Sequence, residues 1–220
     1  MEKQNISELL QKIRENPYRE IIITAPHSGN IEFVLKKTGS AVNGPSGKYK
    51  EKPGTLLAYL TRENNKKPIF APEKGEISEL AELKDGDFVQ AGTPLLKIKH
   101  YLTKKEVIEL ILQQTLFLFR APEKGKYYFL PEIDKKIKTK GCQNVLLSPG
   151  EEVLILSRMK RETYISYEGP RGLIYIVYFK QGQSLNSGDI LFGICPKEDL
   201  EKIKEVVIKV QSEWEENNIG

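Results

Sequence analysis

The feature that most constrains this chain is a fourfold internal repeat. The phrase Ala-Pro-x-x-Gly occurs at residues 25–29, 71–75 and 121–125, and a looser copy, Pro170-Arg171-Gly172, keeps the proline and glycine. The four prolines follow one another at intervals of 46 to 50 residues. Because self-similarity at a near-constant period indicates one structural unit used several times, we expect four copies of a short unit.

Each copy continues in a way that is typical of β-structure, with alternating aliphatic residues and closely spaced glycines. The second and fourth copies share one template, a glycine and an aliphatic residue alternating every three positions: Gly86, Val89, Gly92 and Leu95, then Gly182, Leu185, Gly188 and Leu191. The first copy keeps this template with an insertion at residues 43–52. The third copy keeps only its end, and we expect residues 133–147 to be irregular.

The links between copies indicate how the copies pair. A β-unit of about 35 residues cannot bury one face by itself, so the units must associate. Residues 61–68 and 157–166 are short polar links, which indicate hairpins inside a domain. Between the second and third copies, a capping-box sequence at residues 103–106 precedes an apolar run, which predicts a helix between domains. Pairing of the second copy with the third is the alternative, and it would place that helix inside a domain.

The predicted fold is therefore mainly β, with two domains, a connecting helix and terminal helices. We expect an N-terminal helix within residues 1–20, a first domain at 21–100, a connecting helix at 101–119, a second domain at 120–196 and a C-terminal helix at 197–220. Ten tyrosines and eight phenylalanines are present, and those of the second domain are predicted to serve core packing rather than partner docking.

Composition excludes several classes of function. The 34 basic and 30 acidic residues are mixed along the chain, so the net charge of +4 indicates a solvated surface and no nucleic-acid partner. The two cysteines, Cys142 and Cys195, are far apart, and His27 and His100 form no ligand cluster, which argues against a metal site. The chain shows no apolar signal core and no membrane span, so we expect a cytoplasmic protein.

The paired units resemble the biotinyl/lipoyl carrier domain, a barrel-sandwich hybrid, here in tandem. In that family an exposed hairpin between the half-units presents one lysine that is modified after translation, and the biotin version usually reads Ala-Met-Lys-Met, often followed by Glu-Thr. This chain has Arg158-Met159-Lys160-Arg161-Glu162-Thr163 between its third and fourth copies. The resemblance implies that Lys160 is the attachment residue, with Met159, Glu162 and Thr163 as its recognition context. Arg158 and Arg161 depart from the family pattern.

The first domain lacks this residue. Counting back from Ala71 places Asn64 at the lysine position, and an asparagine side chain cannot form the amide link. Lys66 and Lys67 lie two and three residues farther along the strand. We therefore expect the first domain to be a carrier fold without a carrier site, and Asn64 to occupy the hairpin position equivalent to Lys160.

The resemblance implies a biotin-attachment, carboxyl-carrier-like protein that is not itself an enzyme. It would present a lysine-linked cofactor arm to partner enzymes, with a biotin protein ligase and carboxylase-type enzyme subunits as partners. Lipoate fits less well, because the lipoyl hairpin typically has an acidic residue where this chain has Met159. The alternative is an unmodified lipoyl-like scaffold or adaptor protein in a larger assembly. The sequence leaves open whether the chain forms a homo-oligomer.

Overall fold

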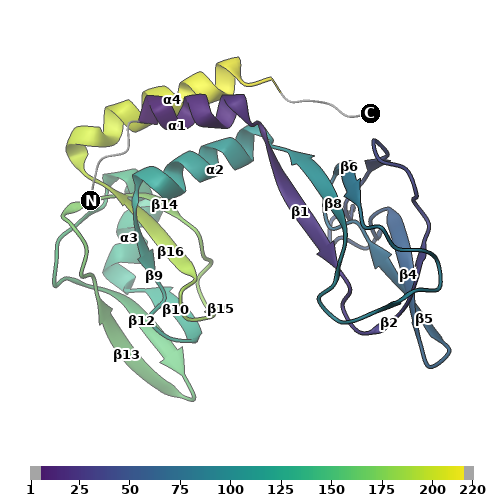
Figure 1. The fold of residues 1–220 in the computed structure, drawn as a ribbon. Coiled ribbons are helices and arrows are strands. Elements are labelled where there is room, and N and C mark those ends of the chain that lie inside the picture. Colours follow the sequence, from purple (N-terminus) through teal and green to yellow (C-terminus); the bar gives the residue numbers. More distant parts are fainter. Residues whose placement is uncertain (1–5, 216–220) are drawn as a thin grey trace. The chain divides into compact units, whose positions relative to one another are not determined.

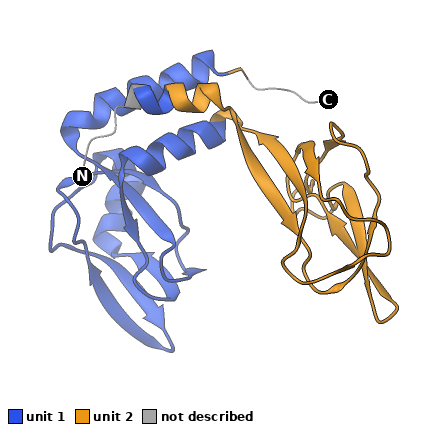
Figure 2. Cartoon of the chain, in the orientation of Figure 1, with its two compact units in different colours: residues 1–10, 105–214 blue, residues 11–104, 215–220 orange. Residues whose placement is uncertain are grey.

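The computed structural model describes residues 6–215 of the chain. It divides into two compact units (Figure 2, orange and blue): an N-terminal unit of residues 11–104, and a C-terminal unit of residues 105–214 that also includes residues 6–10. The boundary between them falls within helix α1 (Ile6–Glu15). Both units are built mainly from short antiparallel strands (Figure 1).

The N-terminal unit contains eight strands in two four-stranded sheets. The strands are β1 (Tyr18–Thr24), β2 (Gly29–Phe33), β3 (Ala41–Val42), β4 (Leu56–Arg62), β5 (Asn65–Phe70), β6 (Gly75–Leu80), β7 (Phe88–Val89) and β8 (Pro94–Tyr101). One sheet has the order β1-β8-β6-β3, and the other has the order β5-β4-β2-β7.

The C-terminal unit repeats this plan with its own eight strands. They are β9 (Phe117–Arg120), β10 (Gly125–Phe129), β11 (Leu146–Leu147), β12 (Glu152–Arg158), β13 (Arg161–Ser166), β14 (Gly172–Val177), β15 (Gln183–Leu185) and β16 (Ile190–Cys195). The sheet orders are β13-β12-β10-β15 and β11-β14-β16-β9, which match the N-terminal unit strand for strand.

Consecutive repeat copies are interlocked by exchanged strands. In the N-terminal unit, β3 from the first copy pairs with β6 from the second, and β7 from the second pairs with β2 from the first. In the C-terminal unit, β11 and β15 make the same exchange. Strand β8 pairs with β1 and β6, which excludes pairing of the second copy with the third. The fold is thus two barrel-sandwich hybrid domains built from four half-repeats.

The glycine that ends the first two Ala-Pro-x-x-Gly phrases is required by the close approach of a neighbouring strand's backbone. A Cβ on Gly29 would lie 2.6 Å from the carbonyl oxygen of Thr61, and one on Gly75 would lie 2.6 Å from that of Lys99. Both distances are well inside ordinary contact, so any side chain would push the strands apart. In these two copies the phrase therefore ends where a neighbouring strand approaches too closely for a side chain.

Each unit has its own apolar core. The N-terminal core is aliphatic and includes Ile31, Leu57, Leu60, Ile77 and Ile98, each fully buried. The C-terminal core is rich in aromatic rings and includes Tyr127, Phe129, Tyr167, Phe179 and Phe192. The Tyr167 ring contacts Phe117, Phe119 and Phe192, with centroids 5.5 to 6.2 Å apart. Core packing thus accounts for most aromatics of this unit, as predicted, whereas Tyr164 is 60% exposed.

Two helices pack on the C-terminal unit. These are α2 (Lys104–Thr115) and α4 (Leu200–Glu213), the latter preceded by the 3₁₀ turn η2 (Lys197–Asp199). Leu112, Leu116 and Ile203 form one apolar cluster with Tyr175 and Cys195. No helix in the described part of the chain is long and apolar enough to cross a membrane.

Three helices are shorter than the segments predicted for them. The N-terminal helix ends at Glu15, because Pro17 follows and β1 begins at Tyr18 rather than at residue 21. The connecting helix spans Lys104–Thr115 and not 101–119, because β8 continues to Tyr101 and β9 begins at Phe117. Residues 18–20, 101 and 117–119, which the predicted helical segments include, belong to strands β1, β8 and β9 instead. The C-terminal helix ends at Glu213, and the prediction to residue 220 extends beyond the described residues.

The prediction that residues 133–147 are irregular is wrong. It contains most of helix α3 (Pro131–Lys140), the 3₁₀ turn η1 (Cys142–Asn144) and β11. Proline at the first helical position, acidic residues in the first turn and lysines in the last favour this helix. Gly141, with φ of 82°, ends it, and Ile133 anchors it in the core.

Candidate attachment site

The hairpin of β12 and β13 has a two-residue turn made of Met159 and Lys160. Arg158 and Arg161 face each other across the hairpin, so only these two residues lie in the loop. Their φ values are 47° and 63°, both positive. Positive φ at both central residues is the signature of a type I′ turn, whose twist matches that of the flanking strands.

The residues of this turn are unfavourable for its backbone. Type I′ turns strongly favour Asn-Gly, because the left-handed conformation costs an ordinary L-residue about 1–2 kcal/mol. The chain places two long side chains there instead of Asn-Gly. The pairing of β12 with both β13 and β10 holds the turn in place. A locally disfavoured conformation that the fold maintains is a reason to look for function at that position.

Both side chains of the turn face solvent. Met159 is 86% exposed, the most exposed of the large hydrophobic side chains described. Lys160 is also exposed, and its ammonium group makes no hydrogen bond or ion pair with the described residues. An exposed, unpaired primary amine at the tip of a hairpin can enter the active site of another protein.

The charges beside Lys160 are partly compensated by a contact between distant residues. The Arg158 guanidinium lies 2.8 Å from the Glu123 carboxylate, which comes from the third Ala-Pro-x-x-Gly phrase. Sequence reasoning gave Glu123 no role at the site, since 35 residues separate the partners. Arg161, Glu162 and Thr163 are exposed along β13. Lys160 therefore lies between one paired and one unpaired arginine.

The predicted recognition residues do not all lie on one side of the hairpin. Met159 and Lys160 form the turn, and Glu162 and Thr163 follow in β13. Neighbouring residues of a strand point to opposite faces of the sheet, so Glu162 and Thr163 diverge. Thr163 pairs with the buried Leu156 and shares its face, whereas Glu162 pairs with Ser157.

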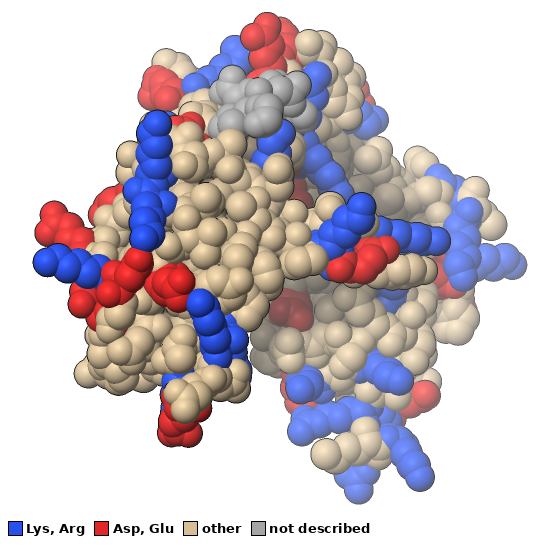
Figure 3. All heavy atoms as spheres, turned by 90° about the vertical axis from the view of Figure 1, so that its right-hand side faces the viewer, with Lys and Arg blue, Asp and Glu red and all other residues tan. Residues whose placement is uncertain are grey.

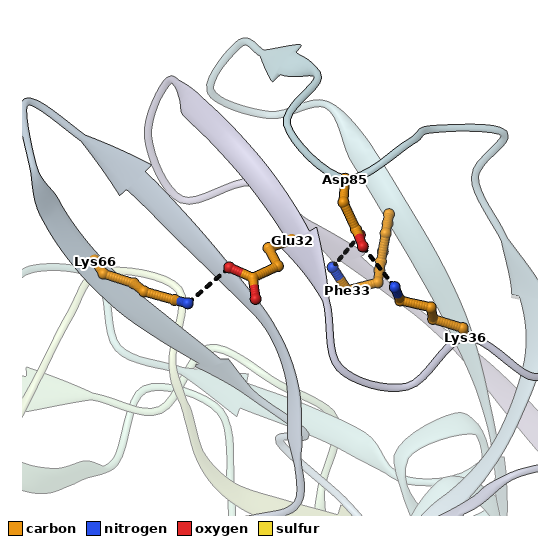
Figure 4. Close-up of polar contacts among 5 residues, drawn as sticks. All are labelled: Glu32, Phe33, Lys36, Lys66 and Asp85. Atoms are coloured by element: carbon orange, nitrogen blue, oxygen red, sulfur yellow. Dashed lines mark hydrogen bonds and ion pairs between the residues drawn. The ribbon is translucent and has the colours of Figure 1, made fainter.

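The N-terminal unit has the same turn without an amine. Glu63 and Asn64 have φ values of 49° and 64°, and Arg62 faces Asn65 across the hairpin. Asn64 therefore occupies the position equivalent to Lys160, which confirms the predicted equivalence. Lys66 lies in β5 beyond the turn, where its ammonium group is 2.6 Å from the Glu32 carboxylate (Figure 4). Lys66 is thus held on the sheet face and does not replace the missing turn lysine.

Two surface cavities of the N-terminal unit are each lined by residues of that unit. One of about 380 Å³ is lined by His27, Arg62, Glu63, Asn65 and Lys67. Another of about 420 Å³ lies beside Phe33 and the ion pair of Lys36 with Asp85 (Figure 4). This ion pair and the Phe33 backbone N–H hold the pKa of Asp85 below its ordinary value. Asp85 therefore acts as a structural link between loops.

Comparison with known proteins gives a fold-level likeness at most. No family model matches the chain, and no curated protein matches it. Among solved structures, it is similar to a single-chain, multi-domain long-chain acyl-CoA carboxylase, with 13% sequence identity and a TM-score of 0.30. The match covers 81% of this chain and 21% of the carboxylase chain. The chain thus spans about a fifth of the length of that protein.

Proposed function

We propose that this protein carries biotin on Lys160 and presents it to carboxylase-type enzyme subunits. The observation that supports the proposal most directly is the Met159–Lys160 turn, a left-handed two-residue turn that exposes an unpaired amine. The turn fits the cofactor because amide formation needs a free ε-amine and no surrounding pocket on the carrier. Bound biotin would supply carboxyl-group transfer, and the protein would supply presentation.

The chemical step proposed at Lys160 is an acyl transfer. A biotin protein ligase would supply biotin as its acyl-adenylate, and the uncharged amine of Lys160 would attack the acyl carbon. The new bond joins the lysine Nζ to that carbon, the bond to AMP breaks, and the amine loses a proton.

In this proposal the chain is not itself an enzyme, and it acts in the cytoplasm together with the ligase. Tethering raises the effective concentration of the cofactor near two partner active sites in turn. The N-terminal unit, with Asn64 in its turn, would be a carrier fold without a carrier site.

Labelling in the presence of a biotin ligase tests the proposal. The protein is co-expressed with a biotin ligase from the same host, and streptavidin blotting and intact mass are measured. We expect wild type to gain one biotin and Lys160→Arg to gain none. The matched variant Asn64→Lys places a lysine in the equivalent turn, which lacks the Met159, Glu162 and Thr163 context, and we expect it to remain unlabelled at that position.

The same experiment separates the alternatives. Labelling by a lipoate ligase and not by a biotin ligase would replace biotin with lipoate. Absence of label from both ligases would overturn the carrier proposal and leave the unmodified scaffold. The scaffold is the second candidate because the N-terminal unit keeps the complete fold and turn with no lysine in that turn.

A further inference from the structure

The outer strands of two equivalent sheets differ in how they are protected. Strand β5 lies at one edge of its sheet in the N-terminal unit, and β13 lies at the corresponding edge in the C-terminal unit (Figure 1). An edge strand exposes every second backbone N–H and C=O, and these groups are a template for another strand. Natural proteins usually block such edges with proline, lysine or a covering segment.

The hairpin register shows which backbone groups point outward. In a two-residue hairpin the flanking residues hydrogen-bond to each other, and bonded pairs then alternate with non-bonded pairs. Because Arg158 faces Arg161, Thr163 bonds to β12, whereas Glu162 and Tyr164 direct their N–H and C=O groups away from the sheet. By the same count, Lys66 and Pro68 are the outward residues of β5.

The β5 edge is closed. Pro68 occupies an outward position and has no N–H to offer an incoming strand. The other outward residue, Lys66, binds Glu32 at 2.6 Å (Figure 4). Its ammonium group also lies 4.2 Å from the centre of the Tyr59 ring. A partner strand would have to displace these contacts.

The β13 edge has none of these protections. Tyr164 takes the place of Pro68, keeps its outward N–H and leaves its ring 60% exposed. Glu162 takes the place of Lys66 and forms no ion pair with the described residues. Tyr164 is followed across the sheet by Ile155 of β12 and then by Tyr128 of β10. The equivalent positions of the N-terminal unit are Tyr59 and the ion-paired Glu32. The open edge thus adjoins an apolar stripe.

We propose that a second copy of this chain pairs its own β13 with this β13, antiparallel and centred on Tyr164. The two four-stranded sheets would then form one continuous sheet across a twofold axis. This proposal does not depend on biotin attachment, because it concerns the backbone of β13 and leaves the Met159–Lys160 turn at the surface.

Charge selects this register and makes the edge self-complementary. Centring on Glu162 would place two carboxylates opposite each other, which is destabilising. Centring on Thr163 would place Lys160 opposite Ser166 of the second copy, without a charge partner. Centring on Tyr164 pairs the two Tyr164 rings, puts Glu162 opposite Ser166 and directs the Lys160 turn toward Glu168 of the second copy, which is exposed. Such a solvent-exposed ion pair is weak and would not withhold the amine.

Sedimentation of the full chain and of one edge variant tests the proposal. We expect wild type to reach about twice the 25.1 kDa of the chain as concentration rises. Tyr164→Pro removes the outward N–H at the position where β5 carries Pro68, so we expect the variant to fold and to associate at least tenfold more weakly. Tyr164→Thr keeps the N–H and is the matched control, which should still dimerise. A wild type that stays monomeric at millimolar concentration, or an unchanged Tyr164→Pro, overturns the proposal.

Disulfide cross-linking tests the register, including the case in which the proline variant misfolds. Opposite residues of a hydrogen-bonded antiparallel pair have Cα atoms about 5.5 Å apart, which suits a disulfide. Tyr164→Cys should therefore form a dimer under mild oxidation. Glu162→Cys should not, because its partner is Ser166 of the second copy, and wild type controls for Cys142 and Cys195. Equal cross-linking of both variants, or of neither, contradicts the proposed pairing.

Discussion

At the scale of single residues, the Met159–Lys160 turn keeps a backbone that its own residues disfavour. Asn64 in the N-terminal turn tolerates the same left-handed conformation better, because its short polar side chain can bond locally. Equivalent turns in one chain therefore differ in intrinsic stability. The less stable one carries the exposed amine, as expected if presentation of Lys160 and not stability determines its sequence.

Replacing Met159 and Lys160 by Asn and Gly should stabilise the C-terminal unit by about 1–2 kcal/mol, because both residues suit positive φ. Denaturant unfolding, monitored by amide exchange in β12 and β14, measures the change in the free energy of unfolding. The control, Glu63→Asn with Asn64→Gly, should gain less in the N-terminal unit. Unchanged or reduced stability of the C-terminal variant would show that the turn is not strained.

Tyr167 is a buried residue whose hydroxyl has a defined role. Its phenol is fully buried and donates a hydrogen bond of 2.7 Å to the Pro170 carbonyl. Tyr167→Phe should destabilise the C-terminal unit by about 1–2 kcal/mol, because the carbonyl loses a buried donor. Tyr49→Phe, at an 81% exposed position, should change stability by less than about 0.5 kcal/mol. Thermal unfolding of both variants gives the comparison, and equal effects would contradict this role.

At the scale of elements, the glycine of the repeat phrase allows two neighbouring strands to approach closely. Gly75 begins β6 where it passes the backbone of β8, and Gly29 begins β2 where it passes β4. Strands β5 and β13 also differ at this scale. They occupy equivalent sheet edges, but only the β13 edge leaves its outward backbone groups open to another strand.

Gly75→Ala should destabilise the N-terminal unit by about 1–3 kcal/mol, since the added methyl must displace the Lys99 carbonyl 2.6 Å away. Glu20→Ala, on an exposed position of β1, is the control and should cost less than about 0.5 kcal/mol. Amide exchange in β8 reports both. A Gly75 variant as stable as the control would mean that the strands separate at no cost.

At the scale of the whole molecule, the two units differ in the buried groups that alkali can ionise. The described N-terminal core holds neither tyrosine nor cysteine. In the C-terminal unit, burial raises the pKa of Cys195 from 9.0 to about 11 and also raises the pKa of Tyr167 and Tyr175 above 10.0. These groups are kept neutral by the folded state, so each ionises more readily in the unfolded chain.

The C-terminal unit should therefore lose stability first as pH rises. The pKa of Cys195 is higher in the folded state than in the unfolded state. Its contribution to folding stability is therefore complete below pH 9 and is lost as the pH approaches 11. Amide exchange between pH 9 and 11, corrected for the intrinsic rate, should show β14 and β16 opening before β6 and β8. Simultaneous opening of both units would contradict the prediction. Below pH 9 the Cys195 thiol should also resist alkylation while the C-terminal unit is folded, because it is buried and neutral.

The sequence by itself determined the features that depend on neighbouring residues. The period of the prolines predicted four half-repeats, the short polar links predicted both hairpins, and the apolar run after residue 103 predicted helix α2. The equivalence of Asn64 and Lys160 followed from counting within one hairpin. The local signals for α3 were also present, but the broken repeat template in the third copy obscured them.

Only the tertiary structure decided what depends on distant residues. Tyr164 and Tyr167 are three positions apart, yet one is 60% exposed and the other is fully buried, because one faces the outside of a sheet and the other enters the aromatic core. The contact of Glu123 with Arg158 and the exchange of β3 and β7 join residues far apart in the chain. Alternation along a strand predicts two faces, but which face is buried, and which edge is open, depends on the strands that pack against it.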